Sequence, residues 1–306
     1  MHFYKIYGLD VKSDYCLEEA YKMQKSAEFD VEIVAGEIAP AIAEETEIDK
    51  MMSGVSLHHF EKERGWIRAK GQGAFVIENG NKITYQLKSG YDPLQVNQLF
   101  LCAALPALLI QRGIISLHGS CVVMGDKGIV ISGVSGAGKS TLTDKLLERQ
   151  GIFMADDTVP LKIHHGKIYA QGAYPQQKIC VENITENVKD RGELVLLPPD
   201  GGKEKYAVRL KKNFSMEEKE LNAMFILYPG EVEEVVVEEI LGSEKVKYLT
   251  DNLYKRKTYL EMGMPVEIFK GCIEIANAVK IYKITRPQNG MTVEEQYEKI
   301  KEILKN

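Results

Sequence analysis

In the first ninety residues, hydrophobic and polar positions alternate in short runs, a pattern that predicts β-strands. The runs lie at residues 3–9, 31–34, 67–70 and 74–87. In the longest of them, Asn79-Gly80 separates two alternating halves, and this dipeptide supplies the positive φ angles of a tight hairpin turn. The pattern therefore predicts a β-rich N-terminal domain over residues 1–90.

A break at residues 89–93 separates this region from the most apolar stretch of the chain. Asp92 is predicted to cap a helix whose first turn contains Pro93. The apolar run at 99–110 has only twelve residues, fewer than the about 20 that cross a bilayer. We therefore expect a buried core helix and no association with a membrane.

From residue 91 onward, the pattern changes to strands that alternate with helices. Strands are predicted at 117–124, 128–132, 152–155, 206–210, 224–228, 232–239 and 279–285, with a hairpin across 164–166. Helices are predicted at 140–147, 244–256, 264–277 and 293–304. Such alternation is typical of an α/β domain, which we place at residues 91–306.

The segment between the predicted strand 128–132 and the predicted helix 140–147 fits the phosphate-binding pattern G-x-x-x-x-G-K-[ST]. An isolated glycine-rich stretch can be an ordinary turn, but strand, loop and helix together favour a nucleoside triphosphate site, with ATP as the ligand. Lys139 is predicted to contact the β- and γ-phosphates, and Ser140 to offer its hydroxyl to Mg²⁺. The residues predicted to bind the nucleotide are Gly133, Val134, Ser135, Gly136, Ala137, Gly138, Lys139, Ser140 and Thr141.

Asp156-Asp157 follows the apolar run 152–155, which places both carboxylates at the C-terminal tip of a strand that we expect beside the loop strand. Phosphoryl transfer needs a carboxylate that holds the metal and one that accepts a proton. We predict Asp156 as the metal ligand and Asp157 as the base, because adjacent like charges raise one of the two pKa values. The alternative is a turn in which the pair precedes Thr158.

Two further side chains are candidates. His118 precedes the loop by fifteen residues, and by itself such a histidine is more often a buried residue than a catalytic one. Lys178 follows the predicted hairpin and either contacts the transferred phosphate or the acceptor, or lies in solvent. Lys203, Lys205 and Arg209 near a glycine turn are interpreted as a surface face.

Three segments, 111–120, 133–141 and 155–157, are similar in order and spacing to HPr kinase/phosphorylase and its looser relatives, which include the kinases of lasso-peptide gene clusters. The shorter segments 7–9, 30–33 and 285–287 also resemble these relatives. The resemblance implies a P-loop domain related to the phosphoenolpyruvate carboxykinase fold, which uses ATP and Mg²⁺ to phosphorylate a serine hydroxyl. It implies that Lys139 binds phosphate, that Ser140 faces the metal, that Asp156 and Asp157 are the paired acids and that His118 is the active-site histidine.

The chain departs from this family in two ways. HPr kinases have glutamate after the loop serine, where this chain has Thr141. The chain also lacks the Arg-Pro-Gly-Arg-Asn type of signature associated with dephosphorylation. The predicted acceptor is therefore a serine-containing protein or peptide other than HPr. A small-molecule kinase and a non-catalytic nucleotide-sensing module are the alternatives.

Composition and charge bear on the class of protein and on its ligands. The 306 residues are 44% hydrophobic and 27% charged, as in ordinary globular proteins. A net charge of −5 argues against a surface that coats nucleic acid. The cysteines are scattered singly, and the first residues alternate like a strand and lack the apolar core of a signal peptide. We expect a cytoplasmic protein with reduced thiols, which can form a homo-oligomer.

Overall fold

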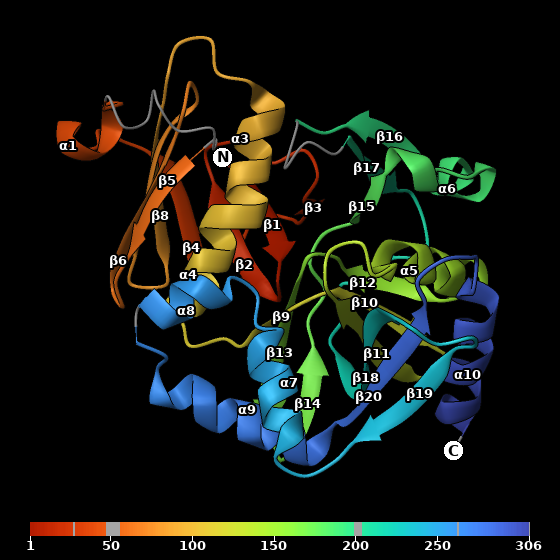
Figure 1. Ribbon diagram of the computed structural model, residues 1–306. Helices are drawn as coiled ribbons and strands as arrows, with labels where there is room; N and C mark the ends of the chain where they lie inside the picture. Colours follow the sequence, from red (N-terminus) through yellow and green to blue (C-terminus); the bar gives the residue numbers. More distant parts are fainter. Residues whose placement is uncertain (27, 47–55, 199–203, 262, 306) are drawn as a thin grey trace. The chain divides into compact units, whose positions relative to one another are not determined.

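The computed structural model describes residues 1–26, 28–46, 56–198, 204–261 and 263–305. The chain forms two compact units, each of which is made of two segments. The first unit contains residues 1–114 and 257–265, and the second contains residues 115–256 and 266–306. Together they form a mixed α/β protein with several sheets (Figure 1).

The first unit is built on an eight-stranded sheet with the order β3-β1-β2-β4-β8-β7-β6-β5. The strands are β1 (His2–Ile6), β2 (Leu9–Ser13), β3 (Tyr21–Lys22), β4 (Val31–Ala35), β5 (Ser56–Phe60), β6 (Arg64–Ala69), β7 (Gly73–Glu78) and β8 (Lys82–Leu87). The short helix α1 (Pro40–Ala43) precedes β5, and α8 (Arg256–Glu261) enters this unit from residue 257. The prediction of a β-rich N-terminal region is therefore confirmed.

Two turns show how local sequence determines this sheet. Asn79 and Gly80 have φ angles of 53° and 64°, which confirms the predicted hairpin between β7 and β8. The run predicted as one strand at 3–9 is instead divided between β1 and β2, because Tyr7 and Gly8 adopt φ angles of 57° and 78°. Alternation continues through this tight turn, so the pattern alone does not reveal it.

The apolar segment after β8 forms a continuous helical stretch made of α3 (Pro93–Leu99), a π-helical turn (Phe100–Ala104) and α4 (Leu105–Gln111). The Asp92 side chain accepts a hydrogen bond from the Leu94 amide at 2.9 Å, which confirms the predicted N-cap. Pro106 lacks the N–H that an α-helix would donate to residue 102, and the helix is widened just before it.

This helical stretch belongs to the first unit, so the compact units divide after Ile114, whereas the pattern predicted a boundary after Gly90. The reason is packing: the Phe100 ring lies edge-on to Phe75, with 5.0 Å between ring centroids, and to Tyr85, at 5.3 Å. The stretch Pro93–Gln111 is longer than the twelve-residue apolar run, and by length and composition alone it could cross a membrane. Most of its residues are buried.

The second unit contains a nine-stranded sheet and a separate sheet of three strands, in the order β15-β17-β16. Its first half contains β9 (Ser116–His118), β10 (Ser120–Met124), β11 (Lys127–Gly133), α5 (Lys139–Glu148), β12 (Ile152–Ala155), β13 (Thr158–His164), β14 (Lys167–Ala170), β15 (Gln176–Cys180), a 3₁₀ turn (Val181–Asn183) and α6 (Glu186–Arg191). Its second half contains β16 (Gly192–Leu196), β17 (Lys205–Leu210), β18 (Lys219–Gly230), β19 (Val236–Ile240), α7 (Glu244–Asp251), α9 (Val266–Ala278), β20 (Lys280–Pro287) and α10 (Val293–Lys305).

At the centre of the large sheet, β11, β18 and β20 run parallel to one another, and β10 lies antiparallel on the other side of β11. The helices α5 and α10 cover one face, where Leu142 and Leu146 of α5 join Ile129 and Ile131 of β11 and Ile300 of α10 in a buried cluster. All of these side chains are buried, so the start of α5 has a fixed position above the end of β11.

Three predicted features of this unit are wrong. β12 does not lie beside β11, because β10 separates the two strands. The predicted strand 232–239 begins only at Val236, since the Val235 amide donates to the Glu295 side chain of α10 at 3.0 Å and not to a strand. The predicted helix 244–256 is interrupted after Asp251, and Lys255 in the interruption has a φ of 52°.

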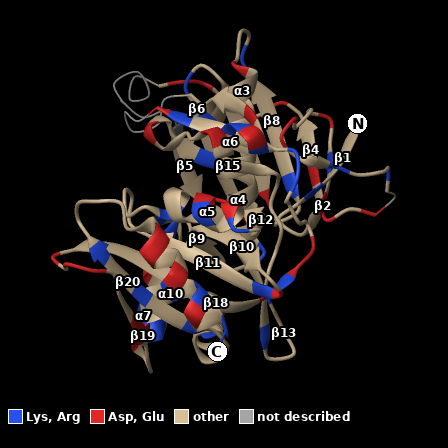
Figure 2. Ribbon diagram, turned by 90° about the vertical axis from the view of Figure 1, so that its right-hand side faces the viewer, with Lys and Arg blue, Asp and Glu red and all other residues tan. Residues whose placement is uncertain are grey.

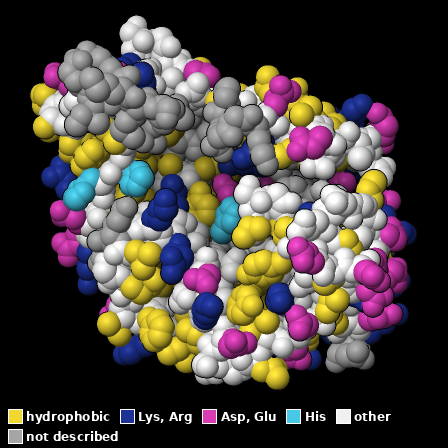
Figure 3. Space-filling model, viewed as in Figure 1, with side chains coloured by type: hydrophobic (Ala, Val, Ile, Leu, Met, Phe, Trp, Pro, Cys, Tyr) yellow, Lys and Arg dark blue, Asp and Glu magenta, His cyan; other side chains and the backbone are white. Residues whose placement is uncertain are grey.

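On the surface, acidic and basic residues are interspersed, whereas several exposed apolar residues gather in one region. Figure 2 shows acidic and basic residues interspersed over both units, without one dominant basic stripe on the face drawn. Figure 3 shows hydrophobic side chains gathered over α9, whose exposed residues include Val266, Phe269 and Ile273. The five cysteines are all free thiols.

Candidate functional site

The glycine loop, residues 133–138, begins at the last residue of β11 and ends at α5, so the predicted order of strand, loop and helix is confirmed. Gly133 has a φ of 137°, and a Cβ atom there would lie 2.4 Å from the Leu227 carbonyl oxygen of β18. Gly138, which caps α5, has a φ of 103°. Side chains at these two positions would strain the backbone or clash, so glycine allows the loop to turn tightly above the sheet.

A cavity of about 580 Å³ opens beside this loop within the second unit. Its lining residues are His118, Gly119, Ser135, Gly136, Gly138, Lys139, Ser140, Thr141, Asp156, Asp157, Lys178, Ile179, Cys180, Glu182, Asn183, Lys205 and Arg286. Of the residues predicted to bind nucleotide, Gly133, Val134 and Ala137 do not line it. Val134 is 52% exposed and Ala137 is fully buried. The cavity has the size of ordinary small-molecule sites.

Lys139 is folded back over the loop. Its Nζ donates to the carbonyl oxygens of Gly133 at 2.7 Å and of Val134 at 3.3 Å. Burial lowers the pKa of Lys139 below its ordinary value, while the carboxylates of Asp156 and Asp157 act in the opposite direction. The cation thus lies at the mouth of the loop with two carboxylates near it.

Asp156 is anchored through both carboxylate oxygens. Oδ1 accepts from the Ser120 hydroxyl at 2.6 Å, and Oδ2 accepts from the Lys178 backbone amide at 2.8 Å. Burial raises the pKa of Asp156, although these two hydrogen bonds act against the shift. Each oxygen has two lone pairs, so the anchored carboxylate can still bind a metal.

The Asp157 carboxylate contacts two basic side chains. Its oxygens lie 3.1 Å from Lys178 Nζ and 3.4 Å from His118 Nδ1. Burial alone would raise the pKa of Asp157, but Lys178 and His118 outweigh it and hold this pKa well below its usual range. The lowered pKa therefore belongs to the predicted base and the raised one to the predicted metal ligand, contrary to the expectation that a raised pKa marks the base.

The backbone of Asp157 is also unusual. Its φ of 67° lies in the left-handed region, which aspartate tolerates better than most residues. The turn between β12 and β13 directs Asp156 and Asp157 to two different sets of partners. Adjacent residues can thus have separate roles.

The acids reach the loop although β12 is not its neighbour. β12 and β11 both pair antiparallel with β10, so they run in the same direction and end at the same edge of the sheet. His118 ends β9 nearby, where its carbonyl accepts from the Ser132 hydroxyl at 2.6 Å and its amide donates to the Asn252 carbonyl at 2.8 Å. The structure thus brings His118, Asp157 and the loop into one cavity, as the sequence predicted.

Arg286, at the end of β20, has a place in the cavity that the sequence pattern did not reveal. Its Nε donates to the Ala137 carbonyl at 2.8 Å, and a terminal nitrogen donates to the Gly136 carbonyl at 3.2 Å. The other terminal nitrogen donates to the Pro287 carbonyl at 2.8 Å. The guanidinium thus binds carbonyls of the glycine loop and does not compete for its N–H groups.

Two further side chains line the cavity, and the first of them differs from the sequence interpretation. Lys205 lines the cavity and is not part of a surface face, because it lies opposite Cys180 in the pairing of β17 with β15. Asn183 accepts from the Thr141 hydroxyl at 3.4 Å. Lys203 lies outside the described residues. Lys178 lines the cavity and contacts Asp157, a contact that the sequence did not predict. No role at the loop was predicted for Lys205, Asn183 or Arg286, although the segment 285–287 is part of the family resemblance, since pairing between distant segments brings them there.

The residues present fit a magnesium–nucleotide complex. No group of three or more histidine, cysteine and acidic side chains that could hold a metal occurs among the described residues. Mg²⁺ needs no such cage, since it is usually bound by one or two carboxylates, phosphate oxygens and water. Ser140, Asp156 and Asp157 line one cavity and are among the oxygen ligands that it offers to the metal.

Comparisons with known proteins give a limited result. No family model matches the chain, and no curated protein matches it. Among solved structures, the chain is similar to the Hpr(Ser) kinase/phosphatase from Coxiella burnetii, with 12% identity, a TM-score of 0.33 and coverage of 62% of this chain and 97% of that chain. The relationship is distant, so a functional argument has to rest on the residues of the cavity.

Proposed function

We propose that this protein is an ATP- and Mg²⁺-dependent kinase that transfers the γ-phosphoryl group to a serine hydroxyl of a protein or peptide. The observation that carries the proposal is the arrangement in one cavity of Lys139 and Ser140, at the start of a loop helix, with Asp156 and Asp157. Transfer of a phosphoryl group requires positioning and neutralised charge more than covalent chemistry, and this set of residues can supply both.

The loop has the features of an anion-binding nest. Its glycines allow successive N–H groups to point inward, and the N-terminus of α5 adds a partial positive charge. Lys139 exchanges its carbonyl partners for the β- and γ-phosphates. Bound Mg²⁺, held by the Ser140 hydroxyl and the Asp156 carboxylate, would neutralise phosphate charge.

The acceptor serine is deprotonated by Asp157 as its oxygen bonds to the γ-phosphorus, and the bond from that phosphorus to the bridging oxygen of ADP breaks. Asp157 is suited to this because its carboxylate contacts the side chains of Lys178 and His118, which can move when substrate enters. Its low pKa does not exclude the role, since in a loose transition state the proton leaves late. Lys178 and His118 position the carboxylate.

The second unit is proposed to have the P-loop fold of the HPr kinase and phosphoenolpyruvate carboxykinase type. The support is the order of His118, glycine loop and acid pair along the chain, and their presence in one cavity. The same residues would serve a small-molecule kinase with another acceptor. A nucleotide sensor, by contrast, needs no proton acceptor beside the metal-binding carboxylate.

The test is incubation with ATP, Mg²⁺ and a short peptide that ends in serine, followed by mass spectrometry. We expect a gain of one phosphoryl group on the peptide and none on the matched peptide that ends in alanine. HPr in place of the peptide should remain unmodified. Phosphorylation of HPr alone would assign the protein to regulatory kinases, and ATP binding without transfer to any hydroxyl acceptor would favour the sensor.

A further inference from the structure

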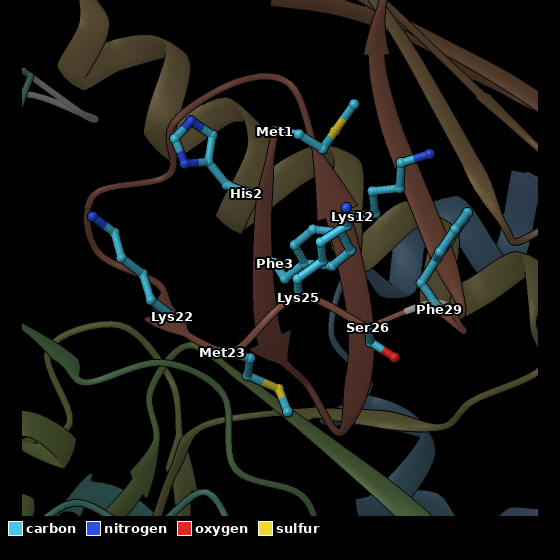
Figure 4. Close-up of a pocket in the computed structure, with 9 residues that line it drawn as sticks. All are labelled: Met1, His2, Phe3, Lys12, Lys22, Met23, Lys25, Ser26 and Phe29. Atoms are coloured by element: carbon cyan, nitrogen blue, oxygen red, sulfur yellow. The ribbon is translucent and has the colours of Figure 1, made fainter.

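The first unit contains a cavity of about 690 Å³ that the proposed function does not use. We call it the β3 hollow, because β3, the edge strand of the sheet, contributes to its lining. Its lining residues are Met1, His2, Phe3, Lys12, Lys22, Met23, Lys25, Ser26 and Phe29 (Figure 4). They come from β1, β2, β3 and the segment between β3 and β4.

The charge of the hollow is positive. Lys12 is paired with Glu32 at 2.8 Å. Lys22 and Lys25 are exposed, and within the described residues neither has an acidic partner. No acidic side chain lines the hollow. In a chain with a net charge of −5, this is a local surplus of positive charge, which attracts an anionic ligand.

The hollow is also apolar. Met23 is 44% exposed and Phe29 is 40% exposed, and Tyr21 beside them is 51% exposed. The ammonium of Lys12 lies 4.8 Å from the centre of the Phe29 ring, a cation–π contact that leaves the rest of the ring to solvent. A ligand that uses the whole hollow therefore carries apolar groups as well as anionic ones, which excludes a free phosphate or a simple carboxylate.

The open edge of the sheet indicates the shape of the ligand. β3 is the last strand in the sheet order and pairs only with β1, with Lys22 opposite Tyr4. The Met23 amide donates to the Phe3 carbonyl at 2.8 Å. In an antiparallel ladder, alternate residues turn their N–H and C=O groups to opposite sides, so those of Lys22 face away from β1. An extended chain can add to this edge as a further strand.

From these features we infer that the β3 hollow binds an extended acidic peptide segment. Its backbone pairs with β3 at Lys22, its carboxylates contact Lys22 and Lys25, and its apolar side chains contact Met23 and Phe29. The inference does not depend on the kinase proposal, because nothing in it requires nucleotide or the residues of the cavity beside the glycine loop.

Fluorescence anisotropy tests this with the full chain and a short fluorescein-labelled peptide in which glutamate alternates with leucine. We expect saturable binding that weakens with salt. Lys22→Glu combined with Lys25→Glu should weaken it about tenfold or more, because two attractive surface pairs become repulsive. Phe29→Ser should weaken it about threefold through lost apolar contact. The matched control is Lys62→Glu with Lys82→Glu, which changes the net charge equally at exposed lysines of the same unit outside the hollow.

Lys22→Pro separates edge pairing from charge, since proline removes an outward-facing N–H that the native ladder does not use. It should bind the peptide more weakly than Lys22→Gln, with an unchanged melting temperature for both variants. Equal losses in the hollow and control variants would overturn the inference. So would the absence of saturable binding, or tighter binding of single-stranded RNA or of anionic lipid vesicles than of the peptide.

Discussion

The cavity beside the glycine loop and the β3 hollow both present lysines, but only the cavity is itself lined by carboxylates as well. Lys139 and Lys178 lie near Asp156 and Asp157, whereas no acidic residue lines the hollow around Lys22 and Lys25. Under the proposed function, a phosphate that enters the cavity meets carboxylates as well as lysines, so a divalent cation would help to bind it. A carboxylate that enters the hollow needs none. Lysines and carboxylates together suit the cavity to a reaction on its ligand, whereas lysines alone suit the hollow to binding.

The largest loss of phosphoryl transfer should come from Lys139→Ala. This variant removes the cation proposed to face the phosphates, so transfer of the γ-phosphoryl group should fall about 10³-fold. Its melting curve should stay unchanged, because among the described residues the lysine donates to carbonyls of the loop itself. The control is Lys62→Glu, at an exposed lysine that lines neither cavity, which should leave transfer unaltered. Labelled ATP measures both, and wild-type transfer by Lys139→Ala would exclude this loop as the nucleotide site.

Substitutions of the two acids should change different kinetic quantities. Asp157→Asn removes the proton acceptor and should lower kcat about a hundredfold at every Mg²⁺ concentration. Asp156→Asn removes the predicted metal ligand and should mainly raise the Mg²⁺ concentration needed for half-maximal rate. Magnesium titrations of the two variants distinguish these roles, and identical profiles would contradict them.

Removal of the metal should distinguish the two sites themselves. With EDTA, we expect the affinity for ATP to fall about tenfold, because phosphate charge is then left facing Asp156 and Asp157. Binding of the acidic peptide to the β3 hollow should not change. Isothermal titration of each ligand with and without EDTA measures this, and a common metal dependence would contradict the comparison.

A smaller effect is expected from Arg286→Gln. Without the guanidinium, the Gly136 and Ala137 carbonyls lose their donors, and the loop is less well ordered before nucleotide binds. The KM for ATP should rise about fivefold with kcat nearly unchanged, since ordering the loop costs binding energy. Arg286→Lys should recover only part of this, because lysine lacks the fork of donors.

The smallest change should be a shift of the acid side of the pH–rate profile. Lys178 holds the pKa of Asp157 below its usual range, so Asp157 stays ionised to low pH. Lys178→Met should raise this pKa, and activity should then be lost at a higher pH during acidification than in the wild type. The stabilisation from ionised Asp157 is present above its unfolded pKa and is lost on acidification, so thermal stability in acid should depend less on pH in the variant.

The sequence predicted those parts of the site that consecutive residues build. The strand, glycine loop and helix were correct because hydrophobic period, glycine and lysine all lie within one short segment. The Asp92 cap and the Asn79-Gly80 turn were correct for the same reason. Asp156 and Asp157 were located correctly relative to the loop, although the strand order assumed for them was wrong.

The sequence did not reveal what distant segments contribute. Arg286 and Lys205 reach the cavity only through the pairing of β20 with β18 and of β17 with β15. The helical stretch after Asp92 was assigned to the wrong domain, because the pattern shows that a helix has an apolar face but not which sheet covers it. Likewise, opposite pKa shifts at two adjacent aspartates follow from their different partners in space.

The parallel pairing of β11 with β18 and of β18 with β20 has a consequence for biosynthesis. The ribosome makes the glycine loop early, but Leu227, against which Gly133 packs, and Arg286, which holds the loop carbonyls, are made much later. A nascent chain that ends before β18 thus has a complete phosphate-binding motif without the sheet that shapes it. Domains generally fold as units during synthesis, so nucleotide should become able to bind, and to protect the emerging protein from proteolysis, only after residue 287 has left the ribosome tunnel.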